Sequence, residues 1–451
     1  MKKKTLFLLV CISIVLLLTL VSCGEPKSAE ALYEKVDQVM NSLNSYEMDM
    51  DMKMTFYVSG YKVTGESRGH AVEYGLQGDE YYFYQEVDTK VTCKELSIAE
   101  NQKNVETYSG GNYFICNESG GASQKLYSAL TSQQAMEYRL ENGMEVGDVF
   151  EDCAERSFEK KEDGTWVLIY SGYTKKAIAH LEESMGLDGG LLDAEIMDMV
   201  ITCVVDENYY VKRMELEFVF EEESKTPTIE ISMTYSAYNA AEKKATEPDV
   251  ADYTKVDDIR LLTQVEDMLT ERAECESGSF TLALTQSVTS TASTSSSLYK
   301  ETDKVTFGED ESGYFYDIDA TVDNVKYDIS YKNGKQTVKT SSKTQDNDQT
   351  DKEARAYIET LINSAGYDRT SVSKVEKRGE GVYRFTCTPG KDVYESYFAN
   401  MGGKLTSATQ TITVTIKDGQ ITKIQSVVTA MGSVVSYGTV TLTVNTTVTF
   451  E

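Results

Sequence analysis

The chain has 451 residues and a formal net charge of −29 at neutral pH, and 40% of its residues are apolar and 10% aromatic. That length makes more than one domain the default, and the apolar content excludes a wholly disordered chain. The negative charge repels nucleic acid and anionic lipid headgroups, so neither is expected as a partner. Tyrosine is abundant, with 30 residues, and favours strands with one wet face.

The N-terminus predicts export. Three lysines at positions 2–4 precede an apolar run over Leu6–Leu20, and Leu20-Val21-Ser22-Cys23 follows. This pattern is typical of a secretory signal, and the run is too short for a normal membrane span. Its end resembles a bacterial lipobox, which implies a signal peptide over 1–22 and a lipid on Cys23. An ordinary signal peptide or a short anchor is the alternative.

A lipid on Cys23 would hold the mature chain at the extracytoplasmic face of the cell membrane, through a short tether over 23–27. The membrane, reached through this lipid, is therefore an expected partner. Loss of the three lysines with the signal takes the net charge from −29 to −32.

The first elements after the tether are a helix and a strand. Ser28 is a suitable N-cap, and apolar residues recur at helical spacing from Ala31 to Leu43. The stretch Tyr46–Phe56 then reads YEMDMDMKMTF, with methionine at every second position. Side chains alternate between the faces of a strand, so one face is predicted to be all methionine and the other charged.

Two interpretations of this methionine face stay open. In one, its side chains pack beneath the opening helix as ordinary core. In the other, they form an adaptable surface for apolar ligands, because methionine is flexible and polarizable. The candidate ligand-binding residues are Met48, Met50, Met52 and Met54.

Four sequence blocks recur in the same order along the chain, which predicts a duplication. Their offset falls only from 219 to 211 between the first pair and the last. The pairs are Thr131–Tyr138 with Thr350–Tyr357, Phe158–Gly172 with Val375–Gly390, Met185-Gly186 with Met401-Gly402, and Thr228–Met233 with Thr439–Val444. The predicted organisation is a first repeat over 28–239, a polar linker over 240–257 and a second repeat over 258–451.

Both repeats are predicted to follow one order of elements: an opening helix, several strands, a second helix, a hairpin, a third helix and closing strands. The second helix starts at Thr131 or Thr350, the hairpin turns at Asp163-Gly164 or Glu380-Gly381, and the third helix covers Thr174–Met185 or Asp392–Met401. The clearest closing strands are Ser407–Lys417 and Gln420–Ala430. The segment Ser287–Ser297, almost wholly Ser, Thr and Ala, is predicted to be a loop.

This order of elements on an exported chain resembles the LolA/LppX type of lipoprotein domain. The resemblance stands on the lipobox, the amphipathic helix ending at Leu43, and strand pairs such as Thr411–Ile416 with Ile421–Val428. It implies an α+β fold of two tandem units, each a curved antiparallel sheet, or incomplete barrel, packed against helices around a cavity that takes acyl chains. Members of that family are usually single domains, so the duplication is a departure, and no individual binding residue carries over.

Enzymatic chemistry has little support in the residues. The two histidines, His70 and His180, stand beside no nucleophile elbow and no catalytic cysteine signature. The paired carboxylates Asp49/Asp51, Asp317/Asp319 and Glu221–Glu223 lack the turning loop that calcium prefers. We therefore expect no catalytic residue, no metal and no cofactor.

Six cysteines follow Cys23, and none has the CxxC spacing of a zinc or redox site. Export permits disulfides, and the possible pairs are Cys93–Cys116 and Cys153–Cys203. Buried free thiols are the alternative.

The leading functional expectation is a cell-surface lipoprotein that binds or carries an apolar ligand, most simply a lipid, without catalysis. The alternative is a non-enzymatic interaction or spacer module of the envelope, with filled cores and a protein partner.

Overall fold

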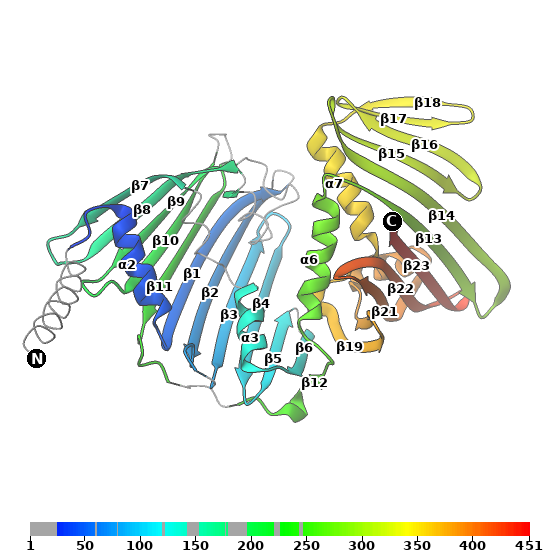
Figure 1. The fold of residues 1–451 in the computed structure, drawn as a ribbon. Coiled ribbons are helices and arrows are strands. Elements are labelled where there is room, and N and C mark those ends of the chain that lie inside the picture. Colours follow the sequence, from blue (N-terminus) through cyan, green and yellow to red (C-terminus); the bar gives the residue numbers. More distant parts are fainter. Residues whose placement is uncertain are drawn as a thin grey trace, which may run out of the picture. The chain divides into compact units, whose positions relative to one another are not determined.

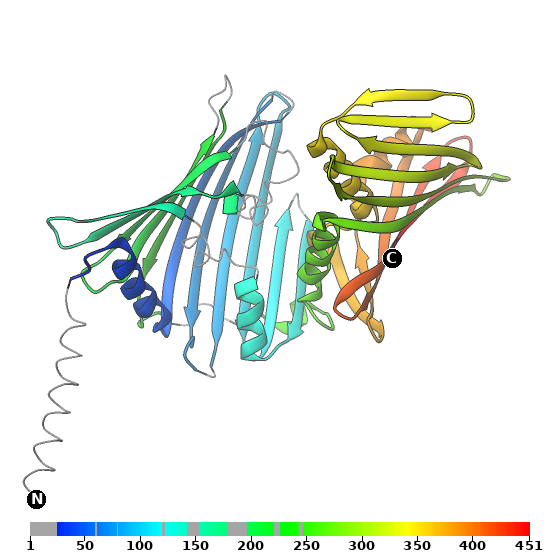
Figure 2. The same cartoon turned by 45° about the horizontal axis from the view of Figure 1, so that its top comes forward.

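The computed structural model describes residues 25–58, 61–78, 80–119, 122–141, 153–175, 177–178, 196–220, 226–242 and 247–451. Its strands form two large, open sheets, one of twelve strands and one of eleven (Figures 1 and 2). The chain separates into two compact units: unit 1 is Met1–Asn101 with Met144–Lys244, and unit 2 is Gln102–Gly143 with Ala245–Glu451. The predicted signal peptide and Cys23 lie outside the described residues.

Compact unit 1 holds strands in the order β3-β2-β1-β11-β10-β9-β8-β7. Every described pairing among them is antiparallel. The bounds are β1 Ser45–Val58, β2 Tyr61–Tyr74, β3 Tyr82–Cys93, β7 Cys153–Lys160, β8 Trp166–Tyr173, β9 Ile196–Val205, β10 Val211–Phe220 and β11 Thr228–Ser236.

Helix α2 (Ala29–Asn41) opens this unit and lies across one face of the sheet (Figure 1). The Ser28 hydroxyl accepts a hydrogen bond from the backbone N–H of Ala31 (3.1 Å), which confirms the predicted N-cap. Its buried side chains Leu32 and Val36 join the apolar core of compact unit 1. The rest of that core comes mainly from strands β8–β11.

Compact unit 2 contains most of β4 (Ile98–Ser109), together with β5 (Asn112–Ser119), β6 (Ala122–Ala129) and the short β12 (Thr254–Lys255), in the order β12-β6-β5-β4. It also contains the eleven-stranded sheet, in the order β18-β17-β16-β15-β14-β13-β23-β22-β21-β20-β19. The bounds are β13 Ser277–Ser290, β14 Ser293–Asp310, β15 Gly313–Val322, β16 Val325–Lys332, β17 Lys335–Thr340, β18 Thr344–Asp348, β19 Val372–Gly379, β20 Val382–Cys387, β21 Gly403–Lys417, β22 Gln420–Val434 and β23 Gly438–Phe450.

Helices α7 (Asp351–Ile362) and α8 (Lys391–Asn400) cover one face of the eleven-stranded sheet in two places. Near β15, the ring of Tyr357 on α7 lies 5.7 Å from that of Tyr316. Over β21–β23, Phe398 of α8 is fully buried in a second cluster with Leu442. The helical bounds are α3 Ser132–Glu141, α6 Leu261–Glu274, α7 Asp351–Ile362, α8 Lys391–Asn400, η1 Val250–Asp252, η2 Asn363–Ala365 and η3 Arg369–Ser371.

Several predicted elements are confirmed. The second helices begin beside Thr131 and Thr350, and Thr350 forms a capping box with Glu353. The turn between β21 and β22 falls at Asp418-Gly419, where both residues have positive φ, as a tight hairpin turn requires. Most of the predicted helix Thr174–Met185, which includes His180, lies outside the described residues.

One prediction is wrong, and one open alternative is decided. Ser287–Ser297 is not a loop but the end of β13 and the start of β14, because backbone pairing with β23 on one side and between the two strands on the other holds it extended. For the cysteines, the alternative of free thiols holds: β8 separates the strands of Cys153 and Cys203, so their backbones are about 10 Å apart, beyond disulfide reach. Cys93 and Cys116 are likewise free thiols.

Candidate functional site

The methionine strand is β1, and its four methionines share a face with small residues on β2. Met48, Met50, Met52 and Met54 pair with Ala71, Gly69, Ser67 and Gly65. On the other side they pair with Tyr235, Met233, Ile231 and Ile229 of β11. A row of long flexible side chains therefore lies between a row of small residues and a row of large apolar ones.

All four methionines are half-buried, and all pack against the apolar core of compact unit 1. The residues between them behave oppositely: Asp49, Asp51 and Lys53 are exposed. Asp49 lies 2.8 Å from Nδ1 of His70, and Asp51 lies 3.5 Å from Nε of Arg68. The predicted alternation of a methionine face and a charged face is confirmed, and on the charged side Asp49 forms a hydrogen bond with His70 and Asp51 an ion pair with Arg68.

Glycines on β2 leave room for two of the methionines. A Cβ at Gly65 would lie 2.6 Å from Cγ of Met54, and one at Gly69 would lie 3.3 Å from Cε of Met50. The methionine side chains thus bend over positions where β2 has no side chain. Met50 and Met54 partly fill that space, and all four methionine side chains remain partly exposed, so this face is not fully covered.

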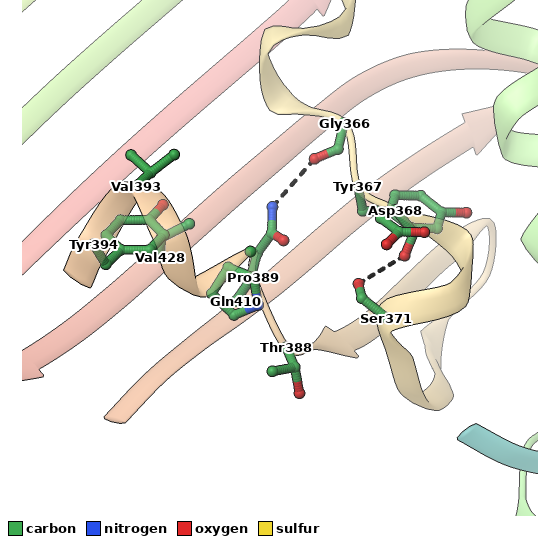
Figure 3. Close-up of a pocket in the computed structure, with 11 residues that line it drawn as sticks. Gly366, Tyr367, Asp368, Ser371, Thr388, Pro389, Val393, Tyr394, Gln410 and Val428 are labelled. Atoms are coloured by element: carbon green, nitrogen blue, oxygen red, sulfur yellow. Dashed lines mark hydrogen bonds between the residues drawn. The ribbon is translucent and has the colours of Figure 1, made fainter. Parts of the chain in front are cut away.

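A second candidate site is a pocket of about 370 Å³ on the eleven-stranded sheet, between the chain after η2 and helix α8 (Figure 3). Val428 of β22 and Gln410 of β21 contribute from the sheet, and Val393 and Tyr394 from α8. The remaining lining residues come from two connecting segments and are Gly366, Tyr367, Asp368, Ser371, Thr388, Pro389 and Gly390.

Hydrogen bonds fix the polar side of this pocket. The Gln410 amide donates to the carbonyl oxygen of Gly366 (3.1 Å) and to the Ser426 hydroxyl (3.0 Å). The Ser371 hydroxyl donates to the carbonyl oxygen of Asp368 (2.7 Å), as Figure 3 shows. The Ser371 hydroxyl is thus committed to a backbone carbonyl, and the residues that line the pocket include no histidine.

Burial raises the pKa of two phenols that line the pocket. Desolvation raises the pKa of Tyr394 and holds the pKa of Tyr367 well above its ordinary value, so both stay neutral at physiological pH. The Tyr367 hydroxyl donates to the carbonyl oxygen of Leu262 (3.1 Å), away from the sheet. The pocket therefore offers aromatic and aliphatic surface together with a fixed amide.

None of the four candidate methionines lines this pocket, which the sequence did not predict. Its lining comes from five separate stretches between positions 366 and 428, and Pro389-Gly390 before α8 is the one local signal of a turn there. The six cysteines after Cys23 are free thiols, of which Cys275 alone is half-buried rather than buried. In the described part of the chain, no three His, Cys, Asp or Glu side chains are grouped as metal ligands would be.

Residues 28–248 match the model of a family of unknown function, DUF6612. No curated protein matches the chain. Among solved structures, the translocator domain of the autotransporter NalP from Neisseria meningitidis is 6% identical over 93% of this chain and 95% of its own, with a TM-score of 0.12. A DUF3598 protein from Nostoc punctiforme is 7% identical over 92% and 98%, also with a TM-score of 0.12. Similarity at these scores carries no argument about fold. No described helix is both long and apolar enough to cross a membrane.

Proposed function

We propose that the protein is a lipoprotein of the extracytoplasmic membrane face that binds an apolar ligand, such as a lipid, without catalysing a reaction. The observation that carries this proposal is the methionine face, where the core of compact unit 1 grades into four half-exposed, flexible side chains. Covering such surface with an alkyl chain gains about 25 cal/mol for each Å² of apolar area removed from water. Methionine adapts to chains of different shape, which suits a carrier.

We further propose that the chain consists of two tandem LolA/LppX-like units, over 28–239 and 258–451. Two strand orders support this: β3-β2-β1-β11-β10-β9-β8-β7 has the same pattern as β15-β14-β13-β23-β22-β21-β20-β19, and β6-β5-β4 the same as β18-β17-β16. The helices occupy equivalent places in the order of elements: α2 and α6 precede β1 and β13, and α3 and α7 precede β7 and β19. The family match over 28–248 ends inside the proposed linker, 240–257.

The membrane anchor in this proposal is a lipid on Cys23. Replacing Cys23 with Ser in the full chain should abolish incorporation of radiolabelled palmitate and release the protein from the membrane fraction of a bacterial host. Unchanged labelling and unchanged membrane retention in the variant would contradict lipidation at this residue.

Ligand binding is tested by extracting lipid from the mature chain, residues 24–451, purified without detergent from a bacterial host, and measuring it by mass spectrometry. Stoichiometric lipid should co-purify, and the double variant Met50→Ser/Met54→Ser should retain much less of it per folded molecule. The matched control is Asp49→Ser/Asp51→Ser, which changes the exposed face of the same strand and should retain lipid normally. Equal retention by the two double variants would remove the methionine face from the proposal.

The alternative, an envelope interaction module, is favoured by one observation. At the turn between β22 and β23, Val435 is 96% exposed and Tyr437 is 52% exposed, although both are large apolar residues. In this alternative, the two side chains belong to the surface that contacts a protein partner. A mature chain that carries no lipid and takes up no fluorescent fatty acid would support this alternative over the carrier.

A further inference from the structure

Asp303 is a carboxylate buried on the apolar face of the eleven-stranded sheet. It lies on β14, directly between Leu282 on β13 and Ala320 on β15, and it is only 5% exposed. The next residues of β14 on the same face are Val305 and Phe307, both buried. Phe307 pairs with Tyr316, whose ring contacts that of Tyr357 on α7 at a tilted angle, so this is the face that α7 covers.

The structure gives this carboxyl no partner. Its Oδ1 atom is buried without a hydrogen bond, and no ion pair to Asp303 exists among the described residues. Lys300 and Lys304 of the same strand alternate onto the opposite face and are exposed. Burial, followed by the charge of Glu301, raises the pKa of Asp303 to about 6, so no cation offsets the desolvation.

An unpaired carboxylate is not a requirement of this kind of sheet. In compact unit 1, the strand beside the methionines has Gly65, Ser67, Gly69 and Ala71 on the corresponding face. Glu73, the buried acid at the end of that row, accepts a hydrogen bond from the Tyr81 hydroxyl (3.0 Å). Of the charged side chains buried in the described residues, Glu73 has a partner and Asp303 has none.

A polar row leads from the half-exposed part of β14 to Asp303. Tyr299 and Glu301 precede Asp303 on the same face of β14, at alternate positions, and both are half-buried. The Tyr299 hydroxyl donates to Glu301 (2.8 Å), which aligns the two side chains. Tyr357 on α7 lies near both carboxyl groups: after burial and the neighbouring Tyr316, the charges of Asp303 and Glu301 raise the pKa of its phenol. Half-buried Leu284 and Val322 flank the row on β13 and β15.

We propose that Asp303, with Glu301 beside it, binds the ammonium group of an amphiphile whose alkyl chain lies on the apolar face of the eleven-stranded sheet. The inference rests on the proposed function, because it takes the ligand to be an amphiphile, and it adds the chemistry of the headgroup. A buried carboxylate needs a cation or a hydrogen-bond donor, and an ammonium supplies both. Two carboxylates on one face and a net charge of −29 select a positive headgroup over a neutral or negative one.

The test compares three twelve-carbon probes by calorimetry at pH 7.5 on the mature chain, each kept below its solubility limit and, for the charged probes, below the micelle concentration. Dodecylamine should bind at least ten times more tightly than dodecanol, and dodecanoate more weakly than either. Asp303→Asn should bring dodecylamine within threefold of dodecanol. The matched control is Asp319→Asn, an exposed acid on the opposite face of β15, which should leave the preference intact.

The outcomes separate the two proposals. If wild type binds the amine and the alcohol equally, prefers dodecanoate, or keeps its preference in Asp303→Asn, the headgroup inference is wrong while apolar binding stands. If none of the probes binds, the proposed function fails as well. Should Asp303→Asn not fold, the wild type decides alone: its preference for the amine should shrink severalfold between pH 7.5 and pH 5, and an unchanged preference would overturn the inference.

Discussion

Replacing Asp303 with Asn should stabilise the protein at neutral pH, because Asn resembles the protonated acid and removes only the buried charge. The pKa of this group is raised from 3.8 to about 6, and a pKa difference of one corresponds to about 1.4 kcal/mol. That sets an upper bound of about 3 kcal/mol, and solvent screening lowers the expected gain to about 1–2 kcal/mol.

The pH dependence follows from the direction of the shift. Since the folded-state pKa of Asp303 lies above its unfolded value, the stability that protonated Asp303 contributes is fully present below about pH 4 and is lost as the pH rises through 6. Glu301 on the same strand and Tyr357 on α7 face this group in both proteins, while Leu282 and Ala320 are uncharged, so the difference isolates Asp303.

Urea unfolding of wild type, Asp303→Asn and the control Asp319→Asn at pH 4.5, 6 and 7.5 measures this difference. The free energy of unfolding of Asp303→Asn should exceed that of wild type at pH 7.5 and approach it at pH 4.5, and the control should follow wild type throughout. A loss of stability in Asp303→Asn at pH 7.5, or a gain that does not change with pH, would refute the reasoning about a buried charge.

Two further substitutions test packing and capping, and a thiol measurement tests the state of the cysteines. Gly432→Ala should destabilise the protein by about 2 kcal/mol in urea unfolding, because its Cβ would lie 2.4 Å from Cδ1 of buried Phe398, whereas Gly390→Ala, with open space around its Cβ, should stay within about 0.5 kcal/mol of wild type. Ser28→Ala should cost about 1 kcal/mol through loss of the cap on α2, and an unchanged unfolding midpoint would show that this cap is dispensable. The unfolded mature chain should show six reactive thiols without reductant, and the folded chain should react fastest at half-buried Cys275; four thiols in the unfolded chain would indicate a disulfide.

Local chemistry explains which elements could be predicted from the sequence. The methionine strand has a strict period of two, and Asp418-Gly419 is the residue pair that a tight hairpin turn needs. Ser28 and Thr350 offer hydroxyls where a helix begins. Each of these signals lies within a few residues of the feature that it predicts.

The wrong and missing predictions depend on contacts between distant segments. Ser287–Ser297 has the composition of a loop, yet Ser287 and Thr289 pair with Thr443 and Thr441 on β23. The pocket beside α8 draws its lining from stretches as far apart as Gly366 and Val428, so no local motif marks it. The composition of a short segment does not indicate which distant strand will pair with it.

The burial of Asp303 also could not be predicted from the local sequence. The alternation of Tyr299, Glu301 and Asp303 has the pattern of a solvated strand face, but this face lies beside α7, and Asp303 on it is buried. Compact unit 1 has half-exposed methionines over β2 glycines on its apolar face, whereas compact unit 2 has a carboxylate without a partner. Since the order of the strands is matched while these faces differ, the order alone does not determine the ligand. If both faces bind, we therefore expect the first to select for chain shape and the second for headgroup charge, a difference that probes matched in length but not in charge will separate.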